Sequence, residues 1–324
     1  MNITKLATKI VAPIISLPGV FEKLSSNLFV TFNYHEISDN PSRFCTDFNL
    51  NVRPAIFAQQ LIWIKKYFNV ISPQQLISGD FQFPAALVTF DDGFKGAFTQ
   101  GAKLLDVAKV PAVVFMNMAM IQGHFFWSGL VTYLCNYSTQ FKQFITLKYG
   151  KPMATDFFLY CTNADVSEFF EKYGETGILD VANNYYGELA SKQDLISSAS
   201  GSIYLGNHLF NHFNAVNLSP NDLIEQYLMN ESALSEYSNH VPLFSYPFGQ
   251  PVRCYNQETD KIITTLGAAR IFTAYSLLNL DKYAVRLHRV SMFEYVDNEK
   301  YFKSHCLVPA FINHLKKWPE ARWL

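Results

Sequence analysis

The chain has few charged residues: Asp, Glu, Lys and Arg make up 16% of its 324 positions, against about a quarter in an average soluble protein. Its 26 basic and 27 acidic side chains leave a formal net charge of −1. Binding along a phosphate backbone requires a surplus of Lys and Arg on one face or segment. The composition therefore excludes nucleic acid as an expected partner, and no sequence feature fixes an oligomeric state.

Cysteine is also scarce, and its five occurrences lack the short spacings of a metal-binding cluster. They are Cys45, Cys135, Cys161, Cys254 and Cys306. An odd number without a regular pattern is typical of free thiols in a reducing compartment. We therefore expect a cytoplasmic protein without a disulfide framework.

Long apolar runs are missing as well. An apolar segment near the start, Ile10–Phe21, follows Lys5 and Lys9, but two prolines interrupt it and it is too short to span a bilayer. No clear small-residue cleavage site of a secretory signal follows it. We expect residues 1–27 to pack on the main domain, 28–324; the alternative is weak peripheral contact with the inner membrane surface.

Predicted strands and helices alternate along the chain, which indicates a parallel α/β architecture. With 49% hydrophobic residues, among them 29 Phe and 18 Tyr, the chain can bury one barrel-sized core. In its first third, the predicted strands are Leu28–Tyr34, Ala85–Phe90 and Pro111–Met118. One predicted helix begins at Pro54, and a second covers Ala97–Ala108.

Residues 124–200 interrupt this alternation and are expected to form a mostly helical insertion packed beside the barrel. Helices are predicted over Asp165–Tyr173 and Ile178–Ala190, and Ser191 caps a further one. The alternation then resumes. Its strands are Ile203–Leu205, Leu243–Tyr246, Arg270–Tyr275 and Ala284–Met292, and its helices are Pro220–Tyr237, Asn256–Leu266 and Asp297–Lys316.

Two adjacent carboxylates, Asp91 and Asp92, follow the strand Ala85–Phe90 and precede Gly93. A buried carboxylate is costly unless it is paired, so packing does not account for them. Successive side chains on extended backbone point in opposite directions, so one can ligate a cation while the other faces a water bound to that cation. The alternative is an ordinary Asp-Asp-Gly turn.

Two histidines, His208 and His212, follow the strand Ile203–Leu205. Four residues apart, they are predicted to lie on one face of a helical turn, with ring nitrogens close enough to share an ion. With one carboxylate they form a set of three ligands that leaves coordination positions for water or substrate. Two surface or core histidines explain the pair in isolation; together with Asp-Asp-Gly, the metal site is favoured.

The candidate residues share one position in the predicted fold, the carboxyl ends of parallel strands. They are His35, Asp91, Asp92, His208 and the turn Pro247–Phe248. In a (β/α) barrel these ends meet at one face, where active sites lie. Loops are polar in general, but coincidence does not explain five residues of these types.

Three motifs, in this order, resemble those of a known family. They are Thr89-Phe90-Asp91-Asp92-Gly93, Gly206-Asn207-His208-x-x-x-His212 and Ser245-Tyr246-Pro247-Phe248-Gly249, preceded by Asn33-Tyr34-His35-Glu36-Ile37. Over roughly residues 28–295 the chain is similar to the polysaccharide deacetylases with the NodB-homology domain, carbohydrate esterase family 4. The resemblance implies an α/β fold, a distorted (β/α)7-type barrel, which here carries the helical insertion.

The resemblance also implies roles for the clustered residues. Asp92, His208 and His212 would bind a divalent cation, for which we prefer Zn²⁺ over Co²⁺, Ni²⁺ or Mn²⁺ because imidazole and carboxylate suit zinc. Asp91 would be the general base. The implied reaction is hydrolysis of an N-acetyl amide on an amino sugar, with release of acetate.

The remaining roles concern the oxyanion and the general acid. The backbone N–H of Phe248, after Pro247, would hold the oxyanion, and Tyr246 and Phe248 would surround the acetyl methyl. His35 is the favoured general acid, since a branch of the family opens with Tyr-His. The other candidate, His288, lies one residue off the family's late Leu-x-His spacing, which on a strand turns a side chain to the other face.

Two positions depart from the family pattern. Leu209 stands where a loop-ordering Ser or Thr is usual, and Tyr246 where many members have the arginine that steadies the base. Arg270 and Arg289 are expected to pair with carboxylates rather than to contact a substrate phosphate.

The sequence thus predicts a metal-dependent N-deacetylase that acts on a polysaccharide of the cell envelope or on its nucleotide- or lipid-linked precursor. One alternative is a catalytically silent module that binds a carbohydrate or a lipid carrier; Asp91 argues against it, because binding needs no base. A second alternative is hydrolysis of a formyl amide or a cyclic ureide on the same fold.

Overall fold

The computed structural model describes residues 3–154, 156–174 and 177–315. Seven parallel strands close into a barrel in the order β1-β10-β9-β8-β7-β6-β5, and the ring closes where β1 pairs with β5. The strands are β1 (Phe29–Tyr34), β5 (Ala85–Phe90), β6 (Ala112–Met116), β7 (Ile203–Asn207), β8 (His240–Ser245), β9 (Arg270–Thr273) and β10 (Arg286–Ser291). The predicted (β/α)7-type barrel is confirmed.

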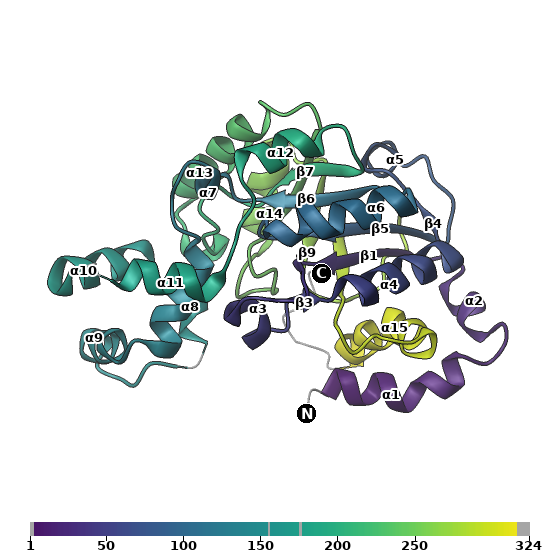
Figure 1. Ribbon diagram of the computed structural model, residues 1–324, viewed down its shortest axis with the longest axis horizontal. Helices are drawn as coiled ribbons and strands as arrows, with labels where there is room; N and C mark the ends of the chain where they lie inside the picture. The colour runs from purple at the N-terminus through teal and green to yellow at the C-terminus, as the bar shows by residue number, and fades with distance from the viewer. Residues whose placement is uncertain (1–2, 155, 175–176, 316–324) are drawn as a thin grey trace.

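Helices cover the outside of this barrel (Figure 1). They are α4 (Pro54–Tyr67), α6 (Ala102–Ala108), α13 (Pro220–Leu234), α14 (Gln257–Thr265) and α15 (Glu299–Leu315). Alternate strand residues point to opposite sides of the sheet. Phe29, Leu87 and Leu287 fill the interior, whereas Val30 and Val88 pack under the helices. Because both faces of the strands are buried, their sequences are almost continuously apolar.

Short elements surround the barrel. β4 (Asn69–Val70) extends the sheet beside β5, and β2 (Glu36–Ile37) pairs with β3 (Asn51–Val52) in a small separate sheet. The short helices are α3 (Arg43–Asp47), α5 (Pro73–Ser78) and α7 (Met118–Ile121), with a π-helical turn at Ala97–Gly101 and 3-10 turns at Phe157–Leu159 and Ala215–Asn217. The helix predicted over 97–108 therefore starts as a π-helical turn and continues as α6.

Most helices between β6 and β7 form a lobe beside the barrel (Figure 1). They are α8 (Trp127–Tyr137), α9 (Thr139–Tyr149), α10 (Asn163–Tyr173) and α11 (Ile178–Tyr186), and α12 (Lys192–Ser198) leads back to the barrel. The lobe has an apolar cluster of its own, which includes Leu134, Phe141 and Phe169. The sequence pattern predicted α10, α11 and α12 but missed α8 and α9. Most residues of α8 are buried, so it lacks the exposed polar side that marks a surface helix.

Two N-terminal helices, α1 (Ile3–Ile15) and α2 (Val20–Ser25), lie near α15 (Figure 1). The Ser304 hydroxyl of α15 donates a hydrogen bond of 2.8 Å to the Thr8 carbonyl of α1. Within the described ranges, no helix combines the length and the hydropathy that a bilayer span requires.

The five cysteines are all buried, and each carries a free thiol. They lie in different parts of the chain's apolar clusters. The expectation that the chain has no disulfide framework is confirmed.

Candidate active site

A cavity of about 340 Å³ lies at the carboxyl end of the barrel strands. Of the residues predicted for the site, those that line it are His35, Asp91, Asp92, His208, His212 and Phe248. They follow β1, β5, β7 and β8. Parallel strands bring their carboxyl ends to one face of a barrel, and this topology brings distant parts of the chain together there.

Asp92, His208 and His212 form a compact buried cluster. One oxygen of Asp92 lies 3.4 Å from Nε2 of His208 and 3.0 Å from Nε2 of His212. One ligand atom from each of the three residues lies within 4.8 Å of the other two. Two imidazole nitrogens and a carboxylate oxygen at these separations fit a divalent cation.

The segment that carries the two histidines is an irregular loop and not the predicted helical turn. Leu209 and His212 have φ values of 58° and 59°, in the left-handed region that right-handed helices do not use. The centroids of the two histidine rings nevertheless lie 4.9 Å apart. The loop conformation, rather than helical periodicity, brings the histidines together.

Buried amides hold this histidine loop. Asn117 donates hydrogen bonds to the carbonyls of His208 and Leu209, the second at 2.9 Å. The side-chain oxygen of Asn207 accepts from the Leu209 N–H at 3.0 Å and from the Asn230 amide at 2.8 Å. These contacts order the loop without the Ser or Thr hydroxyl that Leu209 replaces.

Hydrogen bonding fixes the tautomer of His208. Its Nδ1 lies 2.7 Å from the carbonyl oxygen of Ser245, which can only accept a hydrogen bond, so Nδ1 carries the proton. The lone pair of Nε2 then faces Asp92, as a metal ligand requires. In a part of the chain that is fully described, Nδ1 of His212 has no hydrogen-bond partner.

The electrostatics of the cluster favour the protonation states that bind a cation. Burial raises the pKa of Asp92, but the rings of His212 and His208 lower it more, so the pKa lies well below its usual value. Burial lowers the pKa of His212, although Asp92 opposes this shift. At neutral pH the cluster therefore offers an ionised carboxylate and a neutral His212 ring.

Asp91 does not join the cluster, because its carboxylate is paired with Arg289. The two oxygens of Asp91 accept hydrogen bonds of 2.7 and 2.6 Å from Nη1 and Nη2 of the guanidinium. Burial raises the pKa of Asp91, but Arg289 and the nearby His208 lower it more, so the pKa lies below its usual value. Asp91 is thus held ionised and in one orientation at the edge of the cavity.

Arg289 is completely buried on the inward face of β10, two residues after Leu287. Besides Asp91, it donates to the side chains of Asn33 and Ser245, at 3.0 and 2.8 Å, and to the carbonyl of Thr273 at 3.0 Å. The expected pairing of Arg289 with a carboxylate is confirmed. The sequence did not identify Asp91 as the partner, because only the closed barrel brings the ends of β5 and β10 together.

Arg270 was expected to pair with a carboxylate, but it forms no ion pair with any residue that the structure describes. Its guanidinium donates to the backbone carbonyls of Ala269, Leu76 and Ile77. It lies near α5, at the opposite end of its strand from Thr273. Arg270 is therefore a structural contact away from the cavity.

The structure separates the two candidate acids. His35 lines the cavity and is partly exposed to it. Burial lowers the pKa of His35, while Asp92 and Asp91 oppose the shift. His288 points out of the barrel, its Nδ1 lies 3.1 Å from the Thr273 hydroxyl, and burial lowers its pKa to about 4. Of these two candidate acids, His35 is therefore the one that lies beside the carboxylates.

Of the predicted site residues in the turn after β8, one lines the cavity and two do not. Phe248 lines the cavity with a φ of 60°, and its ring centroid lies 4.9 Å from that of His212. Tyr246 is buried elsewhere, and its hydroxyl contacts Asp260 at 2.8 Å and Thr259 at 3.1 Å. Neither Tyr246 nor Pro247 lines the cavity, so the structure does not place Tyr246 beside an acetyl group as expected.

The insertion and α3 supply the rest of the cavity wall, which sequence reasoning did not identify. Phe44 and Phe48 come from α3 and the loop after it, and Phe158 comes from the turn after α9. Ser128 and Thr132 lie one helical turn apart on α8 and also line the cavity. Both are more than nine-tenths buried, and their hydroxyls have no hydrogen-bond partner on the described residues. The wall thus combines aromatic rings with two free hydroxyl groups.

Residues 78–271, more than half of the chain, match the family model described as polysaccharide deacetylase. Among curated proteins, no relative matches the sequence significantly.

Solved structures of low sequence identity share the fold. A deacetylase, PplD, from Streptococcus pyogenes, solved in complex with acetate, is 14% identical with a TM-score of 0.58, over 87% of this chain and 99% of its own. IcaB from Ammonifex degensii is 18% identical with a TM-score of 0.56, over 88% and 99%. A de-N-acetylase from Aggregatibacter actinomycetemcomitans is 14% identical with a TM-score of 0.56, over 86% and 99%.

Proposed function

This chain belongs to the polysaccharide deacetylase family, and on that premise we propose that it is a metal-dependent N-deacetylase of amino sugars. The substrate is an N-acetylated amino sugar in a cell-envelope polysaccharide or in its nucleotide- or lipid-linked precursor. One observation carries the proposal: the buried cluster of Asp92, His208 and His212 lies in the same cavity as Asp91, which Arg289 holds ionised.

The metal would be held by Asp92, His208 and His212. Their three donor atoms suit a first-row divalent cation, and we propose Zn²⁺, with Co²⁺, Ni²⁺ and Mn²⁺ as alternatives. When bound, such a cation lowers the pKa of a coordinated water and polarises a carbonyl group.

Asp91 is the proposed general base. Its ionised carboxylate accepts the proton of the water that attacks the acetyl carbonyl, and Arg289 fixes the carboxylate in the orientation to do so. The backbone N–H of Phe248, which bonds to none of the described residues, is the proposed donor to the oxyanion.

His35 is the proposed general acid. Cleavage of the C–N bond leaves an amine that must take up a proton, and a histidine supplies one near neutral pH. His35 is the histidine of the cavity that the proposed metal ligands do not include. Burial lowers the pKa of His35, and Asp92 and Asp91 oppose this shift.

The sugar would lie against the wall formed by α3 and the insertion. Phe48 and Phe158, whose ring centroids lie 6.0 Å apart, provide apolar surface for the ring faces of a sugar. Ser128 and Thr132 provide hydroxyl groups for hydrogen bonds to it. A wall of both kinds recognises a flat apolar face with polar edges, which is the shape of a pyranose.

Incubation of the purified protein with a panel of N-acetylhexosamine conjugates tests the proposal, with acetate and formate measured separately. Release of acetate that a chelator abolishes supports the N-deacetylase. Release of formate alone supports the other amide hydrolase, and stoichiometric metal without hydrolysis of any conjugate supports a binding module.

A further inference from the structure

Helix α1 has an apolar face that is exposed. Leu6, Ile10, Ile14 and Leu17, the last just after the helix, are 40%, 65%, 63% and 54% exposed. Their spacing of three and four residues places them in one stripe along the helix. Single exposed apolar residues are common, but a continuous stripe on one helix marks a contact surface.

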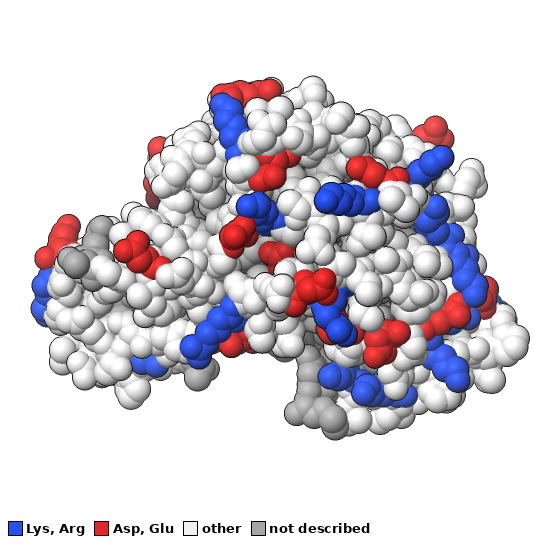
Figure 2. Space-filling view, in the orientation of Figure 1, with Lys and Arg blue, Asp and Glu red and all other residues white. Residues whose placement is uncertain are grey.

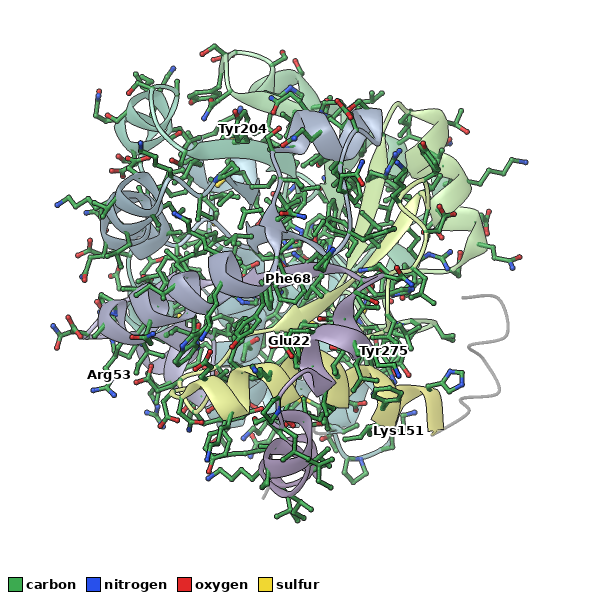
Figure 3. The ribbon with its side chains drawn as sticks, turned by 90° about the vertical axis from the view of Figure 1, so that its right-hand side faces the viewer. Glu22, Arg53, Phe68, Lys151, Tyr204 and Tyr275 are labelled. Atoms are coloured by element: carbon green, nitrogen blue, oxygen red, sulfur yellow. The ribbon has the colours of Figure 1, made fainter. Side chains whose placement is uncertain are left out.

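This stripe is not the face through which α1 is attached to the barrel. That attachment uses Thr8, Ala12 and Ile15, which are buried, and the hydrogen bond from Ser304 of α15. Figure 3 shows α1 at the lower edge of the molecule, below α15, with part of its side chains directed away from the barrel. Because α1 is already attached by its other face, the exposed stripe has no role in that packing.

The charges beside the stripe are positive. Lys5 and Lys9 lie on α1, and the segment 3–21 contains no Asp or Glu. Lys9 is exposed, and Lys5 lies over the Tyr295 ring at 4.9 Å. In Figure 2, Lys and Arg side chains are visible along the lower edge of the molecule, where α1 lies.

We propose that α1 is a docking helix for the surface of an anionic lipid bilayer, with the stripe inserted among the lipids. An apolar face beside lysines and without acidic residues is the pattern of helices that lie in the interface of such a membrane. A second copy of the chain is the less suitable occupant. A symmetric contact between two α1 helices would bring the same lysines close together, and their positive charges would repel one another.

The position of α1 relative to the cavity agrees with docking of α1 on a bilayer. A second groove, of about 650 Å³, is lined by Lys5 at one part and shares Phe48, Asn49 and Phe293 with the catalytic cavity. On a bilayer, this groove would run from the lipid surface to the metal cluster. A lipid-linked amino sugar then reaches the cavity along it; this step, unlike the docking, rests on the proposed function.

Sedimentation of the full chain with lipid vesicles tests the docking. One set of vesicles contains phosphatidylcholine alone and the other contains phosphatidylcholine with phosphatidylglycerol. We expect tight binding to the second set only, weakened by added salt because the lysines contribute. The double substitution Ile10→Ser and Ile14→Ser should weaken it at least about tenfold, since two inserted side chains are lost.

The matched control is the double substitution Val107→Ser and Leu147→Ser, at apolar positions that are 84% and 75% exposed on other helices. It should leave vesicle binding unchanged, and unchanged thermal unfolding of both variants shows that they fold. The proposal is overturned if the native chain does not bind anionic vesicles or if both double variants bind them equally well. A dimer in solution that only the α1 variant disrupts would instead assign the stripe to a second copy.

Vesicle binding is measured without a substrate, so its outcome does not depend on catalysis. If the chain docks but releases no acetate from any conjugate, the proposed function fails and the docking stands. If acetate is released from soluble conjugates without docking, the reverse holds.

Discussion

Asp91 and Arg289, which lie far apart in the sequence, form a buried ion pair through two hydrogen bonds of 2.7 and 2.6 Å. The pair joins the end of β5 to β10 across the inside of the barrel and leaves Asp92, one residue later, to contact His208 and His212. The two neighbouring carboxylates thereby receive different partners, a guanidinium for Asp91 and two imidazole rings for Asp92. The closed barrel makes this division because it brings Arg289 to one carboxylate and the histidine loop to the other.

The substitution Arg289→Lys should lower kcat at least about a hundredfold, because an ammonium cannot hold both oxygens of Asp91 and the base loses its orientation. Steady-state acetate release measures this, and metal content should be unchanged. The control is Arg270→Lys, since the Arg270 guanidinium donates to backbone carbonyls away from the cavity. Equal activity of the two variants would show that Arg289 does not position the base.

The substitution His35→Gln should lower kcat by roughly 10² to 10⁴, the usual contribution of a general acid, whereas His288→Gln should change it little. His288 points out of the barrel to Thr273, so its replacement should cost only about 1 kcal/mol of the free energy of unfolding. Parallel kinetics and denaturant titrations check both. A large loss of kcat in the His288 variant with normal stability would reassign the acid.

The substitution Asn117→Ala should weaken metal binding by about 10- to 100-fold, because Asn117 holds the backbone of the histidine loop. Asn239→Ala is the matched control. Asn239 is also a buried amide with two acceptors, Ser198 and the Ile203 carbonyl, but it lies away from the loop. Both variants should lose stability; metal titration should show weaker binding for the first only.

Glu36 should make the stability of the fold decrease as pH rises. Burial raises its pKa to about 7 from an ordinary 4.5, although the N–H of Ile37 donates to it at 3.0 Å. Between these values the folded chain keeps a proton that the unfolded chain releases, so the free energy of unfolding falls by up to about 3 kcal/mol. Urea titrations from acid to weakly alkaline pH should show this decline, and Glu36→Gln should remove it. A parallel decline in both proteins would assign it to other groups.

The sequence was sufficient for the residues that belong to strands and their ends. Apolar runs predicted β1, β5 and β6, and the position of Asp91 and Asp92 directly after a strand predicted the barrel face at which the cavity lies. The sequence was insufficient where tertiary contacts determine the backbone conformation. The histidine loop is held by Asn117 and Asn207 rather than by helical bonds, so its spacing suggested a helix that does not form.

The sequence pattern also did not predict which side chains near the ends of β8 and β10 face the cavity. Tyr246 and Phe248 follow β8 two residues apart, yet only Phe248 faces the cavity, because the turn places it at a φ of 60°. Arg289 was recognised as an ion-pair candidate, but its carboxylate was not. Ser128 and Thr132 gave no signal at all, since α8 is buried on most sides.

The most direct test of the central claim measures bound metal and acetate release in the same samples of three proteins. The native chain should hold one divalent cation and release acetate. Asp91→Asn should retain the cation without turnover, and His212→Ala should lose both. Retention of the cation by the His212 variant, or acetate release that persists after the metal has been removed, would contradict the account.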